Sequence, residues 1–232
     1  MRREKLAEKR PSATVLGYRE AAVTGGAAGV RDCWQFFALG SPAMSDVVSL
    51  ELLLDQATED AVRAEWAALA DAGMSSLAPH TSASNRPHVT LLVRRTLAPL
   101  DASLLARIAA ALPLALTLGE PILFGDGDRR VFVRPVALTP ELEDLHRMLH
   151  AGVAVDASSA PLSEQAGGGP ADDADAPHTR PGEWTPHVTL ARRLRVSDIP
   201  AARALVAGEL HGRVTALRRW DAASKTVTRL VG

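Results

Sequence analysis

The residue types most capable of chemistry lie in two identical pentapeptides. Residues 87–91 read Pro-His-Val-Thr-Leu, and residues 186–190 repeat the same five. Histidine titrates near pH ~6.5, so near neutrality one imidazole can be neutral while another is protonated. Such a pair can serve as general base and general acid, each contributing roughly 10²–10⁴ in rate. Threonine hydroxyls can donate hydrogen bonds to phosphate oxygens. We therefore expect His88, Thr90, His187 and Thr189 to be catalytic in phosphodiester chemistry that needs no metal ion.

Strands must position these side chains. The sequence predicts strands over residues 88–94 and 187–193, and side chains on a strand alternate between its two faces. His88 and Thr90 therefore share one face, while Val89 and Leu91 point into the core. The second motif repeats this arrangement, so each copy offers an imidazole and a hydroxyl side by side on a rigid element.

The motifs are parts of a longer internal repeat. After each one the sequence predicts a helix, a long strand, a turn and another strand. The helices start at caps Asp101 and Ser197, and the strands lie near 114–124 and 131–137 in the first copy and 213–220 and 225–231 in the second. A strand at 47–54, a helix capped by Thr58 through about 72 and a helix at 140–150 capped by Thr139 complete the pattern. Such a repeat predicts an α+β fold with two pseudo-symmetric lobes, whose pseudo-two-fold axis would bring both motifs to one cleft.

The sequence resembles a known family. The paired His-x-Thr motifs are similar to those of the two-histidine (2H) phosphoesterase superfamily, especially its bacterial 2'-5' RNA ligase and cyclic phosphodiesterase branch. The likeness covers about residues 47–231. It implies a bilobal α+β fold with two antiparallel sheets around a central cleft and helices outside. It also implies hydrolysis of 2',3'-cyclic phosphates to 2'-phosphates, reversible 2'-5' joining of RNA ends in some members, and catalysis by His88, Thr90, His187 and Thr189.

Residues near the motifs are candidates for substrate binding. Arg86 precedes the first motif and could contact phosphate, although a solvated surface charge is the alternative. Phe124 and Trp220 fall at similar places in the two repeats, and Trp184 precedes the second motif. All three could stack on bases, with core packing as the alternative for each. Trp66 lies on the apolar side of its helix and is expected in the core.

Other chemistries fit poorly. His146 and His150 have metal-ligand spacing on a predicted helix, but no His-Glu-x-x-His pattern accompanies them, so solvent-facing or capping roles are expected. Cys33 is the only cysteine, which excludes a four-thiolate zinc site. The glycine run at 25–29 is not followed by Gly-Lys-Ser/Thr, so no ATP site is predicted. The sequence thus predicts no metal and no cofactor.

Composition limits the partners. The formal net charge is −1, so RNA recognition must come from a local site rather than from the overall field. No stretch of 18 apolar residues occurs, so no membrane span is predicted. We expect a cytoplasmic monomer that binds RNA ends or nucleotide cyclic phosphates. Residues 1–43 are expected to be a poorly ordered extension before Met44, and 44–232 a single 2H phosphoesterase domain with a long loop at 153–183.

Two alternatives to an RNA phosphoesterase stay open. One is a small-molecule cyclic phosphodiesterase acting on nucleotides or ADP-ribose. The other is a non-catalytic domain of the same fold that binds RNA or nucleotide. Which histidine is acid and which is base also stays open.

Overall fold

The computed structural model describes residues 47–153, 175–206 and 208–232. The extension predicted at 1–43 and most of the loop predicted at 153–183 lie outside this part. In chain order the elements are β1 (Val48–Leu54), α2 (Gln56–Asp71), β2 (His88–Arg94), α3 (Ala102–Ala111), β3 (Leu114–Leu118), β4 (Ile122–Phe124), β5 (Arg129–Pro135), α4 (Pro140–Gly152), η3 (Pro177–Thr179), β6 (His187–Arg195), η4 (Val196–Asp198), α5 (Ile199–Leu205), β7 (Leu210–Asp221) and β8 (Thr226–Val231).

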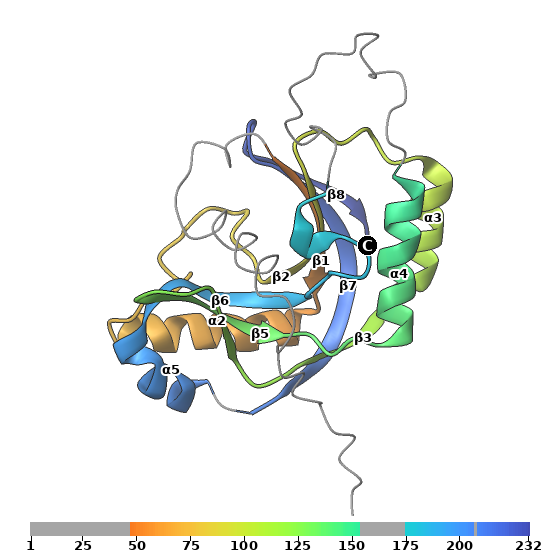
Figure 1. Cartoon of the computed structure of the whole chain (residues 1–232). Helices are drawn as coiled ribbons and strands as arrows, with labels where there is room; N and C mark the ends of the chain where they lie inside the picture. Colours follow the sequence, from red (N-terminus) through yellow and green to blue (C-terminus); the bar gives the residue numbers. More distant parts are fainter. Residues whose placement is uncertain (1–46, 154–174, 207) are drawn as a thin grey trace, which may run out of the picture.

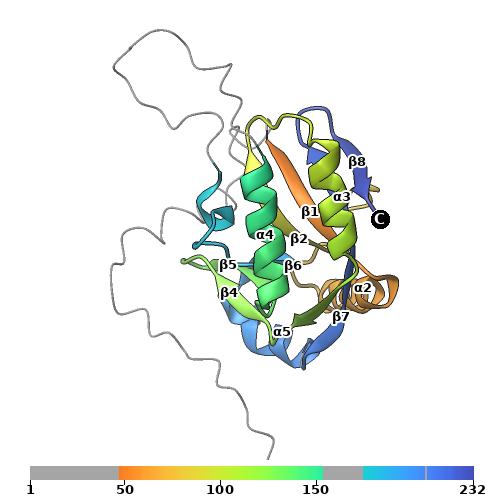
Figure 2. The ribbon, with the colours of Figure 1, turned by 90° about the vertical axis from the view of Figure 1, so that its right-hand side faces the viewer.

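The described strands form two antiparallel sheets (Figure 1). The larger sheet has five strands in the order β2-β1-β7-β3, with β8 also paired to β7, and the smaller has three in the order β4-β5-β6. Helices α3 and α4 contact each other on the outer side of the larger sheet, which Figure 2 faces. Helices α2 and α5 pack beneath the smaller sheet (Figure 1). The α+β architecture with two antiparallel sheets and outer helices is confirmed, although the two sheets are unequal.

The two halves of the chain are interleaved. Strands β1 and β2 come from the first half, but β7 and β8 of the second half complete their sheet. Conversely, β4 and β5 are completed by β6 of the second half. Each motif strand therefore lies in a sheet built by both halves.

Local signals explain most element ends. The side chains of Asp101 and Thr139 cap α3 and α4 as predicted. The predicted cap Thr58 is wrong: Asp55 caps α2, and its carboxylate accepts from the backbone N–H of Thr58 at 2.9 Å. The predicted cap Ser197 is also wrong, because residues 196–198 form η4 and α5 follows with Asp198 as its N-cap residue.

The long strand predicted at 114–124 is two strands in different sheets. β3 pairs with β7 in the larger sheet, and β4 pairs with β5 in the smaller. The break falls at residues 119–121, where Pro121 has no backbone N–H to continue a ladder. The chain crosses between the sheets here.

Candidate active site

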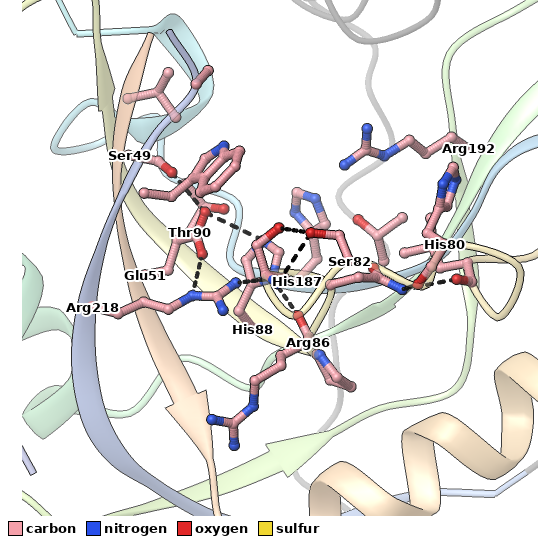
Figure 3. Close-up of a pocket in the computed structure, with 18 of the residues that line it drawn as sticks. Ser49, Glu51, His80, Ser82, Arg86, His88, Thr90, His187, Arg192 and Arg218 are labelled. Atoms are coloured by element: carbon pink, nitrogen blue, oxygen red, sulfur yellow. Dashed lines mark hydrogen bonds and ion pairs between the residues drawn. The ribbon is translucent and has the colours of Figure 1, made fainter. Parts of the chain in front are cut away.

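The two histidines line one cleft of about 420 Å³ (Figure 3). His88 is the first residue of β2 and His187 the first of β6. Thr90 and Thr189 line the same cleft, two residues further along each strand. Val89 and Val188, which alternate with them, are fully buried on the other face. The structure therefore brings together all four predicted catalytic residues.

Both imidazoles are held in the same way. Nδ1 of His88 lies 2.6 Å from the carbonyl oxygen of Arg86, and Nδ1 of His187 lies 2.7 Å from that of Thr185. A carbonyl oxygen only accepts, so each Nδ1 carries the hydrogen, and in a neutral ring the lone pair then lies on Nε2. The proline directly before each histidine favours an extended backbone at the residue before it, Arg86 or Thr185. The carbonyl of that residue is the one that contacts the imidazole.

Two tryptophans hold the motif strands through hydrogen bonds to their backbones. The indole N–H of Trp66, on α2, donates to the carbonyl of Thr189 at 3.0 Å. The indole N–H of Trp184, in the segment before β6, donates to the carbonyl of Thr90 at 2.9 Å. Each motif threonine is thus anchored through its backbone by a tryptophan from a different part of the chain.

Trp184 is therefore not placed to stack on a base. It is buried, and its ring stacks on that of His146 with centroids 4.0 Å apart. Its indole N–H is used by Thr90, so substrate contact would require it to leave the core. Trp66 is in the core as expected.

The floor of the cleft holds a buried ion pair that the sequence pattern did not single out. In the sheet register Glu51 of β1 lies opposite Arg218 of β7 on one side and Thr90 of β2 on the other. Arg218 Nε donates to Glu51 Oε2 at 2.7 Å, and the Ser49 hydroxyl donates to Glu51 Oε1 at 2.6 Å. That same Oε1 lies 3.7 Å from Nε2 of His88. One signal was available: Ser49 and Glu51 alternate within an otherwise apolar strand, so they share a face.

This carboxylate is held in its ionised form. Burial alone would raise the pKa of Glu51, but the charges of His88 and Arg218 and the hydrogen bonds from Ser49 and Arg218 hold it below the usual value. A negative charge is therefore fixed beside one of the two histidines.

The surroundings of His187 are different. Burial lowers the pKa of His187 to about 4, and the charge of His88 acts in the same direction. The hydrogen bond from Nδ1 to Thr185 partly opposes this shift. The ring of Phe124 meets the His187 ring edge-on at 5.2 Å. Phe124 thus lies against the histidine and is not among the residues that line the cleft, where we had expected it to stack on a base.

The other predicted binding residues, Trp220 and Arg86, have different surroundings. Trp220, opposite Ser49 in the register, lines the cleft and is partly exposed, as base stacking requires. Arg86 also lines the cleft, but its guanidinium is bound to the buried carboxylate of Glu59 at 2.5 Å. Charged or polar groups that the predictions did not assign to the site complete the lining, among them His80, Ser82, Ser84, His178 and Arg192.

The segment before the second motif is ordered where the structure describes it. Residues 177–179 form η3, and the backbone N–H of Ala176 donates to the carbonyl of Val93 at 2.9 Å. Asp175 forms ion pairs with Arg94 at 2.5 Å and with His150 at 3.0 Å. This end of the predicted loop is thus tied to β2 and α4.

The solvent-facing position expected for His146 and His150 is wrong, because both side chains are largely covered. His146 is buried and its Nε2 lies 3.0 Å from the carbonyl of Thr179, while His150 contacts Asp175 and the carbonyl of Leu91. Within the described ranges, no three His, Cys, Asp or Glu side chains gather closely enough to hold a metal ion.

The pattern of the 2'-5' RNA ligase superfamily matches residues 58–231. The chain belongs to this superfamily. Its members include phosphoesterases and RNA ligases, and both His-x-Thr motifs of this chain fall inside the matched region.

Comparison with curated proteins gave no significant match. Among solved structures, Usb1 of Kluyveromyces marxianus has 16% identity and a TM-score of 0.40, over 82% of this chain and 100% of that chain. The same protein with uridine monophosphate gives 15% identity and a TM-score of 0.37, over 81% and 99%. Both likenesses are distant, and superfamily membership rests on the sequence match. In the part of the chain that the structure describes, no helix is long and apolar enough to cross a membrane.

Proposed function

We propose that this 2'-5' RNA ligase superfamily member is a metal-independent phosphoesterase that acts on RNA-type 2',3'-cyclic phosphate or 2'-5' phosphodiester bonds. One observation carries the proposal: two imidazoles line one cleft, each with Nδ1 held by a carbonyl two residues earlier. Each therefore presents Nε2 for proton transfer.

The residues suit in-line displacement at phosphorus. One Nε2 removes a proton from the attacking water, and the other gives a proton to the leaving sugar oxygen. We expect the hydroxyls of Thr90 and Thr189, which line the same cleft, to donate to the non-bridging oxygens, where negative charge gathers in the transition state. Arg192, which lines the same cleft, adds positive charge around the phosphate.

The test is turnover of a panel of 2',3'-cyclic nucleotides and 2'-5' linked oligonucleotides. Wild-type protein should form 2'-monophosphates from the cyclic substrates. His88→Ala and His187→Ala should each lose roughly 10²–10⁴ in kcat while remaining folded by circular dichroism. His211→Ala is the matched control, because this histidine is 71% exposed and is not among the residues that line the cleft. Full activity in either cleft variant would contradict the proposal.

Chelation provides a second check. Because the two imidazoles perform both proton transfers, EDTA should leave the rate unchanged. Loss of activity that a divalent ion restores would rule out the metal-independent mechanism.

A small-molecule substrate is the second candidate. A cleft of about 420 Å³ has room for roughly one nucleotide, and the net charge of −1 gives no general attraction to RNA. Comparing kcat/KM for cyclic mononucleotides with that for oligonucleotides ending in a cyclic phosphate separates the two. Binding without turnover across the panel would favour a non-catalytic nucleotide-binding domain.

A further inference from the structure

The two histidines have identical motifs but different neighbours. Nε2 of His88 lies 3.7 Å from a carboxylate oxygen of Glu51. His187 lies against the edge of Phe124 and near His178, whose pKa is lowered to about 4 by burial and then by His187 itself. One imidazole thus has a fixed anion beside its reactive nitrogen, and the other has aromatic rings.

The Glu51 carboxylate is rigidly placed. It is 4% exposed, and both of its oxygens are engaged, by Ser49 at 2.6 Å and by Arg218 at 2.7 Å. Arg218 is itself held by the carbonyl of Ser84 at 3.0 Å. Burying an ionised carboxylate costs free energy even when it is paired, so a position in the floor of a reactive cleft calls for a functional reason.

We infer that Glu51 is a positioning residue that directs Nε2 of His88 into the cleft as a proton donor, so that His88 is the general acid of hydrolysis and His187 the general base. The inference rests on the proposed function. Glu51 does not touch the reacting atoms and acts only through His88. It lies outside both pentapeptides, so it goes beyond the roles that the motifs assign.

Three charged side chains and the neutral His187 face the cleft around His88, and the assignment rests on where the one anion among them, Glu51, lies. Glu51 approaches from β1, Arg218 from β7, and Arg192 and His187 from β6. Arg218 lies 3.5 Å from Nδ1 of His88, on the side already donating to the carbonyl of Arg86. Glu51 lies on the Nε2 side, where the transferred proton must reside.

Nε2 of His187 takes a proton from water as the water oxygen forms its bond to phosphorus. The bond from phosphorus to the leaving sugar oxygen breaks, and its electron pair goes to that oxygen. The proton on Nε2 of His88 moves to the same oxygen. His187 ends protonated and His88 neutral, and exchange with solvent restores both.

The leaving group tests this assignment. A nucleoside 5'-(4-nitrophenyl phosphate) releases a stable phenolate that needs no proton, whereas a 2',3'-cyclic nucleotide releases a basic alkoxide. With the cyclic substrate, His88→Ala and His187→Ala should both lose roughly 10²–10⁴, and Glu51→Gln should lose part of this. With the nitrophenyl substrate, His88→Ala and Glu51→Gln should recover most of their activity and His187→Ala should not.

A pH profile gives an independent reading. In Glu51→Gln the imidazolium of His88 loses its neighbouring negative charge, so the alkaline limb of kcat/KM should move about one pH unit lower. Glu51→Asp should restore part of this shift, and the acid limb should not move. Glu120→Gln is the control: its carboxylate accepts from the backbone N–H of Gly208 and is not among the cleft residues. A purely structural role for Glu51 would lower the rate at every pH without moving either limb.

The outcomes separate the inference from the proposed function. Recovery by His187→Ala instead of His88→Ala on the nitrophenyl substrate would overturn the inference alone, as would unmoved limbs in a folded Glu51→Gln protein. Absence of turnover by wild-type protein on both substrates would overturn the proposed function, and the inference with it.

Discussion

The imidazole of each motif is oriented by the residue two positions before it. A carbonyl holds Nδ1, and this fixes the tautomer without any acidic side chain. The threonine two positions later shares the face and offers its hydroxyl to the same cleft. In the proposed mechanism, a span of five residues thus supplies both a proton-transfer group and an anion-binding group.

The threonine hydroxyls can be removed without changing shape. Thr90→Val and Thr189→Val keep the β-branched side chain that strands favour but lose the donor to the developing negative charge. Each should lower kcat by roughly 10²–10³, as loss of one oxyanion donor does elsewhere. Thr228→Val, on the exposed strand β8, is the control and should be unchanged in steady-state kinetics. Undiminished kcat in both cleft variants would contradict the role of the hydroxyls.

The titration of His187 sets the acid side of the pH profile. Its pKa is about 4, lowered first by burial, and a general base works only when deprotonated. The rate should therefore be retained as pH falls below the ordinary histidine value and should drop only as pH approaches 4. Measuring kcat/KM from pH 3 to 8 checks this, and an acid limb near pH ~6.5 would contradict it.

At the scale of elements, the motif strands are held by segments distant in sequence. Trp66 on α2 reaches the second motif, and Trp184 reaches the first. The Asp175 ion pairs hold the segment that carries Trp184 against β2 and α4. The strand ends that bear the histidines are therefore held by contacts with distant segments.

Asp175 provides a stability prediction. Burial would raise the pKa of Asp175, but hydrogen bonds from His150 and Arg94 lower it to about 2, below the reference value of 3.8. A depressed carboxyl pKa stabilises the fold above the unfolded-state value, and this stabilisation is lost as pH falls toward 2. Asp175→Asn should thus cost about 2 kcal/mol at pH 7. Urea unfolding of both proteins at pH 7 and pH 3 checks it: the difference should shrink at pH 3, and a difference independent of pH would contradict the linkage.

At the scale of the whole molecule, one buried arginine joins several parts of the chain. Arg134 of β5 is fully buried and pairs with Glu65 of α2 at 2.5 Å. It also donates to the carbonyls of Gly119, Val206 and Gly208, which lie in the connections after β3 and before β7. The smaller sheet is thereby fastened to the segments that lead into and out of the larger one.

Removing this arginine should destabilise the protein. Arg134→Met leaves a carboxylate and three carbonyls without their donor, and breaking such a buried pair costs about 3–5 kcal/mol. The double variant Arg134→Met/Glu65→Leu should recover part of the loss, because the stranded charge is gone. Denaturant unfolding of the single and double variants measures this coupling. A single variant as stable as wild type would contradict the role of Arg134.

The sequence predicted those features that short patterns encode. Strand β2 begins and ends as predicted, and the caps Asp101 and Thr139 are confirmed, because strand alternation and helix capping depend on neighbouring residues. The four motif residues share a cleft for the same reason. Glu51 and Arg218 escaped prediction because they become neighbours only through the register of β1 against β7.

The aromatic residues show which features a local sequence pattern does not predict. From the sequence alone, Trp184 and Trp220 are equally good candidates for base stacking. In the structure Trp184 is buried against His146, whereas Trp220 lines the cleft. Strand periodicity predicts on which face of a strand a side chain lies, but it does not predict which helix or loop packs on that face. That depends on long-range packing, which no local pattern records.

The exchange of strands between the halves bears on how this chain could be divided. A cut between Val153 and Asp175 would give one piece with β1 to β5 and another with β6 to β8. The first would lack β7, the central partner of both β1 and β3, and the second would hold none of the strands that pair with β6. Each piece carries one histidine of the pair. Separately expressed pieces should therefore be inactive and poorly folded alone. Only their reassociation would rebuild the cleft with both histidines.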